Sequence, residues 1–179
     1  MKNAMQRAIL PALIFTCFSF FSTQAQSTAN VTLNVVLQNA ASIVINGANN
    51  VATLTYAAPA DYTNGVSLDQ AAALTTISNQ PYSVTVYASG ELTNGTNTIP
   101  VGDVTVTPSL ASANTDITLT GVAIPVGTAS AANIIVSTAG TASQDFNLNY
   151  STEAAPTADF INKPTGTYTT TLTYTLTNP

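Results

Sequence analysis

Carboxylates are almost the only side chains in this chain that could perform acid–base or metal chemistry. Its 179 residues include eight Asp and Glu, three Lys and Arg, one Cys and no His. A Ser-His-Asp or Cys-His catalytic site is excluded because no histidine can act as the base. A zinc site would have to be built from carboxylates alone, which suit zinc poorly. The chain also lacks a Gly-rich phosphate loop with its lysine.

The carboxylates of this chain could support two kinds of chemistry. A pair of carboxylates can hydrolyse a glycosidic bond, with Glu91 or Glu153 as a proton donor. Calcium takes oxygen ligands, and Asp61, Asn64 and Asp69 fall in one loop-like segment. However, the acids are scattered singly, and Asp and Asn also favour turns for their own reasons. We therefore predict that the protein is not an enzyme and that it has no catalytic residues, no cofactor and no metal site.

The composition excludes further classes of protein. Charged residues make up only 6% of the chain, against about 25% in an average soluble domain. So few Lys and Arg cannot neutralise a phosphate backbone, so we predict no nucleic-acid binding. Disorder is also disfavoured, because 45% of the residues are hydrophobic. What remains is a globular domain with a surface rich in Thr and Asn.

The first 25 residues have the layout of a secretory signal peptide. Lys2 and Arg7 precede an apolar run over residues 8–21, and small residues lead to a cleavage point after Ala25. The run is shorter than the roughly 20 residues of a membrane helix, so we predict no stable membrane span. Cys17 follows Thr16 rather than a small Gly or Ala, which disfavours a lipid anchor. We expect a secreted or cell-surface protein.

We therefore expect residues 26–179 to form the exported chain, as one β-sandwich domain. They keep all eight acids but only one basic residue, Lys163, which gives a formal charge of −7, and they contain no cysteine. The fold must therefore be stable without disulfide bonds. This is possible for a domain of this size, because about 150 residues bury roughly 70% of the surface of the unfolded chain.

Apolar residues alternate with polar ones in short runs that are separated by turn signals such as Asn46-Gly47 and Asn94-Gly95. This period of two is typical of half-buried strands. It predicts strands near 31–37, 41–46, 51–56, 82–89, 98–107, 117–121, 133–138, 144–151 and 167–177. The best helical candidate is the short Ala-rich stretch 69–74. Many short strands without crossover helices predict an all-β fold, a single immunoglobulin-like antiparallel β-sandwich.

The first and last of these runs are the candidates for an assembly surface. The first run can contribute to its own core, or it can add to the open edge of a neighbouring subunit. The last run is long and nearly uncharged, and we expect it to lie centrally in a sheet or against a partner. The apolar residues concerned are Val31, Leu33, Val35, Leu37, Tyr168, Leu172, Tyr174 and Leu176.

The closing run, residues 166–176, resembles the last strand of pilin-type domains, which have a Gly-x-Tyr motif followed by alternating apolar residues. In particular, it resembles spore coat protein U-like domains and archaic chaperone–usher pilins. Residues 81–86 also resemble a central strand of these domains and of WxL-like surface modules. The chain has no cysteines after its first run and has Thr170 where such pilins often have Asp. The resemblance implies an exported structural or adhesive subunit, fimbrial in type, whose partners are itself or related subunits.

A second hypothesis is an extracellular module that binds cell-wall material or other glycans. Aromatic rings suit the apolar faces of sugars, and the candidates for such stacking are Tyr62, Tyr82, Tyr87 and Tyr150. The chain has no Trp, and a Tyr within a strand more often packs in the core or against a cross-strand neighbour. Exposed tyrosines gathered on one face would favour this hypothesis.

Overall fold

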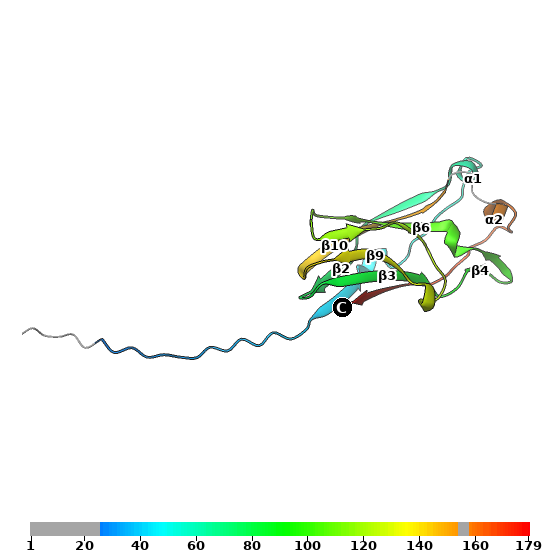
Figure 1. Ribbon diagram of the computed structural model, residues 1–179. Helices are drawn as coiled ribbons and strands as arrows, with labels where there is room; N and C mark the ends of the chain where they lie inside the picture. The colour runs from blue at the N-terminus through cyan, green and yellow to red at the C-terminus, as the bar shows by residue number, and fades with distance from the viewer. Residues whose placement is uncertain (1–25, 154–157) are drawn as a thin grey trace, which may run out of the picture. The chain divides into compact units, whose positions relative to one another are not determined.

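The computed structural model describes residues 26–153 and 158–179 and confirms the all-β prediction (Figure 1). The predicted signal peptide, with Cys17, lies outside these residues. The strands are β1 (Ala41–Ile45), β2 (Ser67–Ser78), β3 (Tyr82–Ala88), β4 (Leu92–Asn94), β5 (Asn97–Ile99), β6 (Val104–Leu110), β7 (Ile117–Leu119), β8 (Val122–Ala123), β9 (Ala132–Ser137), β10 (Thr141–Thr152) and β11 (Leu172–Thr177). Short helices are α1 (Asp61–Asn64) and α2 (Ala158–Ile161), with 3-10 turns η1 (Gly47–Asn49), η2 (Val101–Asp103) and η3 (Thr128–Ser130).

The chain divides into two units, residues 1–36 and residues 37–179. In the first unit, the described residues 26–36 are exposed and belong to no helix or strand. The second unit contains every named strand. The prediction of a strand over 31–37 is therefore wrong for the single chain. The physical reason is that a strand needs a neighbour for its backbone hydrogen bonds, and these residues belong to no strand pair.

Two antiparallel sheets form the sandwich of the second unit. One has five strands in the order β1-β2-β10-β6-β8, and the other has four in the order β11-β3-β9-β7. Strands β4 and β5 form a separate hairpin. The order β1-β2-β10-β6 reproduces the A-B-E-D sheet of an immunoglobulin domain, and β3 beside β11 reproduces strands C and F. In an immunoglobulin domain a G strand follows beside F. Here β11 is an edge strand, and no strand of the described chain takes the G position.

The core lies between the two sheets and is built from alternate residues of the central strands. In β3, Tyr82, Val84, Val86 and Ala88 are buried, while the residues between them are half-buried. Burial of such a side chain is worth about 1.5–3 kcal/mol. The other buried apolar residues in this cluster are Ala73, Leu74, Val101, Val104, Val106, Ile124, Ile134, Ile135, Phe146, Leu148 and Tyr150. In β3, the period of two therefore encodes the core positions.

Three local predictions are wrong. The strand expected over 98–107 is interrupted by η2 and forms the two strands β5 and β6. The stretch 69–74, expected as the best helical candidate, lies within β2. Pairing with β10 at Asp69, Gln70 and Leu74, and with β1 at Leu74, overrides the preference of Ala for helix. Residues 51–56 form no strand. Side chains tether this stretch instead: Gln70 Nε2 donates to the Val51 carbonyl at 2.8 Å, and the Tyr56 hydroxyl donates to Thr152 Oγ1 at 2.7 Å.

A β-bulge interrupts β2 at Ala72. The register of β2 against β10 shifts between the pairs Phe146–Leu74 and Leu148–Gln70. Ala72 has a φ of 46°, in the left-handed region that an alanine rarely occupies. Two asparagine side chains hold it there: Asn147 Oδ1 accepts the Ala72 N–H at 2.8 Å, and Asn46 Nδ2 donates to the Ala72 carbonyl.

Candidate functional site

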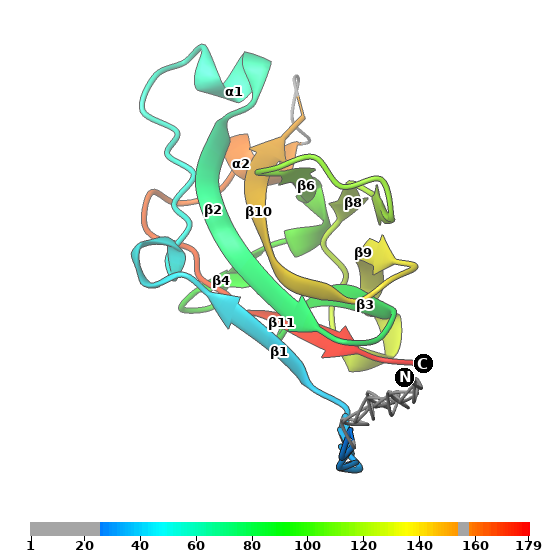
Figure 2. The same ribbon diagram turned by 90° about the vertical axis from the view of Figure 1, so that its left-hand side faces the viewer.

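Strands β1 and β11 are edge strands of different sheets and lie beside each other on one side of the sandwich (Figure 2). We call this side, formed by β1 and β11, the open side. β11 pairs with β3 from Leu172–Ala88 to Thr177–Ser83, and within the described ranges no strand pairs with its other edge. The expectation that the last strand lies centrally in a sheet is thus wrong. A partner at its free edge stays a prediction.

The inward-facing apolar side chains of the open side are only half-buried. Ile43 and Ile45 of β1 are in this state, as are Leu172, Tyr174 and Leu176 of β11. By contrast, Val84 and Val86 of the central strand β3 are 0% exposed. An inward side chain of a central strand is covered by the strands on both sides of it. An inward side chain of an edge strand has a neighbouring strand on only one side. One more strand with apolar side chains would remove this surface from water.

The chain itself contains such a run in residues 26–40, which we call the N-terminal segment. Val31, Leu33, Val35 and Leu37 are 91%, 83%, 74% and 86% exposed. In an extended conformation these alternate residues share one face. The hypothesis that they fill the core of their own chain is therefore wrong in this structure. A run of exposed apolar side chains is unusual on a soluble monomer, so residues 31–37 are a candidate interaction surface.

The two residues after the Gly-x-Tyr motif, Thr169 and Thr170, anchor the start of β11 to the neighbouring hairpin and turn, whereas Tyr168 of the motif bonds within its own loop. The backbones of Thr169 and Thr93 exchange hydrogen bonds at 3.0 and 3.1 Å. The Thr170 hydroxyl donates to the Gly90 carbonyl at 2.7 Å, and the Tyr168 hydroxyl donates to the Pro164 carbonyl at 2.9 Å. Tyr168 therefore lies before β11 and helps to fix its approach, whereas Leu172, Tyr174 and Leu176 belong to the open side.

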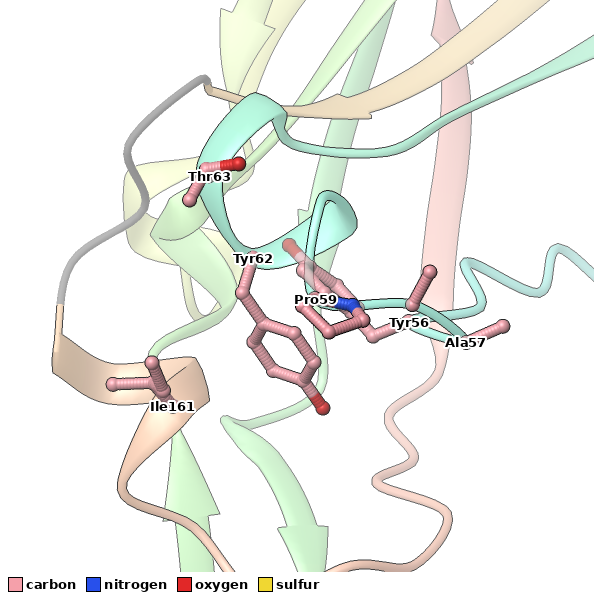
Figure 3. Close-up of a pocket in the computed structure, with 7 residues that line it drawn as sticks. Tyr56, Ala57, Pro59, Tyr62, Thr63 and Ile161 are labelled. Atoms are coloured by element: carbon pink, nitrogen blue, oxygen red, sulfur yellow. The ribbon is translucent and has the colours of Figure 1, made fainter.

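An aromatic hollow forms a second candidate site, at the end of the sandwich that carries α1 and α2 (Figure 3). Its volume is about 500 Å³, and its lining is Tyr56, Ala57, Ala58, Pro59, Tyr62, Thr63 and Ile161. The ring of Tyr56 lies 4.9 Å from that of Tyr62 and stacks on Phe160 at 5.1 Å, measured between centroids. Burial raises the pKa of Tyr56, against the opposing effect of its hydrogen bond with Thr152.

Asp61 shapes the wall of this aromatic hollow. Its carboxylate accepts the backbone N–H groups of Ala57 and Ala58, both at 2.7 Å. These two bonds fold the chain into the turn that precedes α1, the helix that carries Tyr62. Gly65 ends α1 with a φ of 75°, a conformation that favours glycine. The acid that the sequence offered as a calcium ligand thus has a structural role.

The four tyrosines expected to stack on sugars do not gather on one surface. Tyr82 and Tyr150 are 2% and 6% exposed, so these two predictions are wrong: the rings fill core positions of β3 and β10. Tyr87 is half-buried on the outer side of β3, and Tyr62 lines the aromatic hollow. Tyr56 and Phe160 could not be predicted as part of this site, because the stacking of residues so far apart in the chain leaves no local signal in the sequence.

Other carboxylates are also engaged in holding the backbone or neighbouring side chains. Glu91 Oε2 accepts the Val101 N–H at 2.6 Å, Asp69 accepts Asn149 Nδ2 at 2.7 Å, and Asp145 accepts the Thr75 hydroxyl at 2.5 Å. No cluster of three or more His, Cys, Asp or Glu that could hold a metal ion occurs in the described part of the chain. Over the same residues, no helix is long and apolar enough to cross a membrane.

Comparisons with known proteins do not assign the chain to a family. No protein-family model matches it, and no curated protein matches it either.

Proposed function

We propose that this chain is an exported, non-enzymatic structural or adhesive subunit that assembles by strand addition. The N-terminal segment of one copy adds to the free edge of β11 in the next copy. One observation carries the proposal: the same chain has an exposed strand-length run of alternating apolar residues and an edge strand, β11, whose outer side pairs with no strand of residues 26–153 and 158–179. Adding a strand to an open edge supplies backbone hydrogen bonds, and the alternate side chains supply specificity.

The two surfaces match in length and chemistry. Residues 31–37 can lie along β11, Leu172–Thr177, and the four alternate apolar side chains would then cover Leu172, Tyr174 and Leu176. Each apolar side chain that becomes buried contributes about 1.5–3 kcal/mol. Because the donor and acceptor surfaces differ, the contact is head-to-tail, and it builds an open filament wherever the rotation between copies does not close a ring. Such a subunit agrees with the resemblance to archaic chaperone–usher pilins.

The distribution of charge supports the same proposal. Natural edge strands usually carry Lys or other charges, which oppose edge-to-edge pairing. Residues 26–40 contain no charged side chain, and neither do β1 and β11. The N-terminal segment and the two edge strands therefore lack the charged side chains that prevent edge-to-edge pairing in soluble monomers.

A charge placed on the apolar face of the N-terminal segment tests the proposal. The exported chain should form concentration-dependent polymers, seen by size-exclusion chromatography with light scattering and by electron microscopy. Leu33→Asp should abolish them, because assembly would bury the new carboxylate among apolar side chains. Its melting temperature as a monomer should not change, since Leu33 is 83% exposed.

The matched control is Thr32→Asp, which places the same charge on the opposite face of the extended segment. We expect this variant to polymerise like the unmodified chain. The proposal fails if the unmodified chain stays monomeric at high concentration, or if Leu33→Asp assembles as well as Thr32→Asp.

A second candidate function is glycan binding at the aromatic hollow. The pairing of Tyr56 and Tyr62 beside an open, mostly apolar wall favours it, because tyrosine rings stack on the apolar faces of sugars. A pull-down on cell-wall polysaccharides should then retain the unmodified chain and lose Tyr62→Ala. Tyr87→Ala, outside the hollow, is the control. A glycan array on which the unmodified chain binds nothing would rule this function out.

A further inference from the structure

Asn79, the first residue after β2, holds the end of the N-terminal segment by three hydrogen bonds. Its backbone N–H donates to the Ala40 carbonyl at 3.1 Å, and its side-chain Oδ1 accepts the Ala40 N–H at 2.9 Å. Its Nδ2 donates to the Gln38 carbonyl at 2.7 Å. One asparagine thus binds the backbone of both Ala40 and Gln38.

These bonds continue the β1–β2 ladder past its end. The register of the ladder pairs Ala41 with Ser78, so Ala40 opposite Asn79 is the next position along the same line. The side chain of Asn79 also bonds to Gln38, two residues before Ala40. Residues 38–40 are therefore held as an extension of β1 rather than as a turn.

The conformation of residues 38–40 decides whether the N-terminal segment can reach its own sandwich. The outer edge of β1 is free within the described chain. To lie along it, residues 31–37 would have to reverse direction, with residues 38–40 as a hairpin loop of the usual two to five residues. Such an intramolecular contact has an effective concentration in the millimolar range and would compete with assembly.

We infer that Asn79 is a positioning residue that prevents the N-terminal segment from folding back onto its own chain. It thereby reserves the segment for a second copy. This role of the second copy rests on the proposed function, whereas the block on folding back does not.

The turn that carries Asn79 is fixed from two other sides. Asn178 Nδ2 donates to Ser78 Oγ at 2.9 Å and to the Pro81 carbonyl at 2.8 Å. The turn at Gly140 approaches so closely that a Cβ there would lie 2.7 Å from the Asn79 carbonyl carbon. Asn178 therefore provides a matched control, since Asn178→Ala disturbs the same turn and leaves the bonds to Gln38 and Ala40 in place.

Hydrogen–deuterium exchange of the dilute, monomeric chain, purified after export from an expression host, tests the inference. In the unmodified chain and in Asn178→Ala, the amides of residues 31–37 should exchange at the rate of an unstructured peptide. In Asn79→Ala they should exchange at least tenfold more slowly, independently of protein concentration, because the segment folds back. At high concentration the same variant should polymerise less than Asn178→Ala.

The outcomes separate this inference from the proposed function. If residues 31–37 exchange as fast in Asn79→Ala as in the unmodified chain, the inference is wrong, whether or not the chain polymerises. If the unmodified chain never polymerises but Asn79→Ala shows the slowed exchange, the proposed function fails and the inference stands. Should Asn79→Ala not fold, Asn79→Asp replaces it, because Asp keeps the acceptor for Ala40 and loses only the donor to Gln38. Fast exchange in a folded Asn79→Asp would then overturn the inference.

Discussion

The hydroxyl groups of Tyr150 and Tyr174 lie 2.7 Å apart and join the two sheets of the sandwich by a hydrogen bond. Tyr150 comes from β10 in the five-stranded sheet and Tyr174 from β11 in the four-stranded sheet. Burial raises the pKa of Tyr150, and burial together with the neighbouring Tyr150 raises that of Tyr174. This bond secures the edge strand that we propose as the acceptor.

Removing one of these two hydroxyls should destabilise the sandwich. Tyr174→Phe leaves the buried hydroxyl of Tyr150 without its partner, which costs about 1–3 kcal/mol. The double variant Tyr150→Phe/Tyr174→Phe should lose less stability than the two single variants added together, because it leaves no buried hydroxyl without a hydrogen-bond partner. Denaturant unfolding of the four proteins checks this, and simple additivity would contradict the pairing.

Alkaline pH should unfold the protein through the same two tyrosines. Their pKa values are raised in the folded state, while an unfolded tyrosine ionises near pH 10. The folded state thus keeps protons that the unfolded state releases, so stability is full below about pH 10 and falls as the pH rises beyond it. Ultraviolet titration of the phenolates should show these tyrosines ionising only as the chain unfolds. Tyr174→Phe should show a shallower loss of stability in this range.

Replacing Ala72 by glycine should stabilise the fold. The φ of 46° at Ala72 is a left-handed conformation, which costs a residue with a Cβ about 1–2 kcal/mol and costs glycine little. The larger conformational entropy of glycine in the unfolded chain offsets part of this difference. We therefore expect the free energy of unfolding to rise by about 0.5–1 kcal/mol. Ala72→Val, with a branched Cβ, should instead be destabilising. Equal or lower stability of Ala72→Gly in thermal unfolding would contradict the account of the bulge.

A methyl group at Gly140 should strain the turn beside Asn79. Its Cβ would lie 2.7 Å from the Asn79 carbonyl carbon and 2.8 Å from the Ser78 carbonyl oxygen, both on the backbone. Overpacking of this kind costs about 1–3 kcal/mol, so the melting temperature of Gly140→Ala should fall. Gly47→Ala is the control, because a Cβ there meets no atom within 4 Å.

The local alternation of side chains predicted much of the sandwich. It placed the strands at 41–45, 82–88 and 132–137 within a few residues, because burial on one face of a strand leaves a period of two in the sequence. It failed at β2, where short Ala-rich residues carry little alternation and long-range pairing decides the conformation. The antiparallel class followed from the absence of crossover helices.

The candidate site was only partly predictable from the sequence. The apolar face of residues 31–37 was visible in the sequence, but a periodic run does not reveal whether its partner lies in the same chain. The edge position of β11 depends on the order of the strands, which no local pattern records. Likewise, Tyr150 and Tyr62 read alike as isolated tyrosines, and only the packed structure shows that one is core and the other lines a hollow.

The contacts of Asn178 with the β2–β3 turn have a practical consequence for labelling. Asn178 binds Ser78 and Pro81, next to the residue that binds Gln38 and Ala40. A fluorescent fusion or affinity tag attached after Pro179 would therefore project beside residues 38–40, where the N-terminal segment joins β1. Such a tag would crowd the second copy that we propose adds to the free edge of β11. An epitope inserted near α1, at the far end of the sandwich (Figures 1 and 2), would leave that region clear for microscopy.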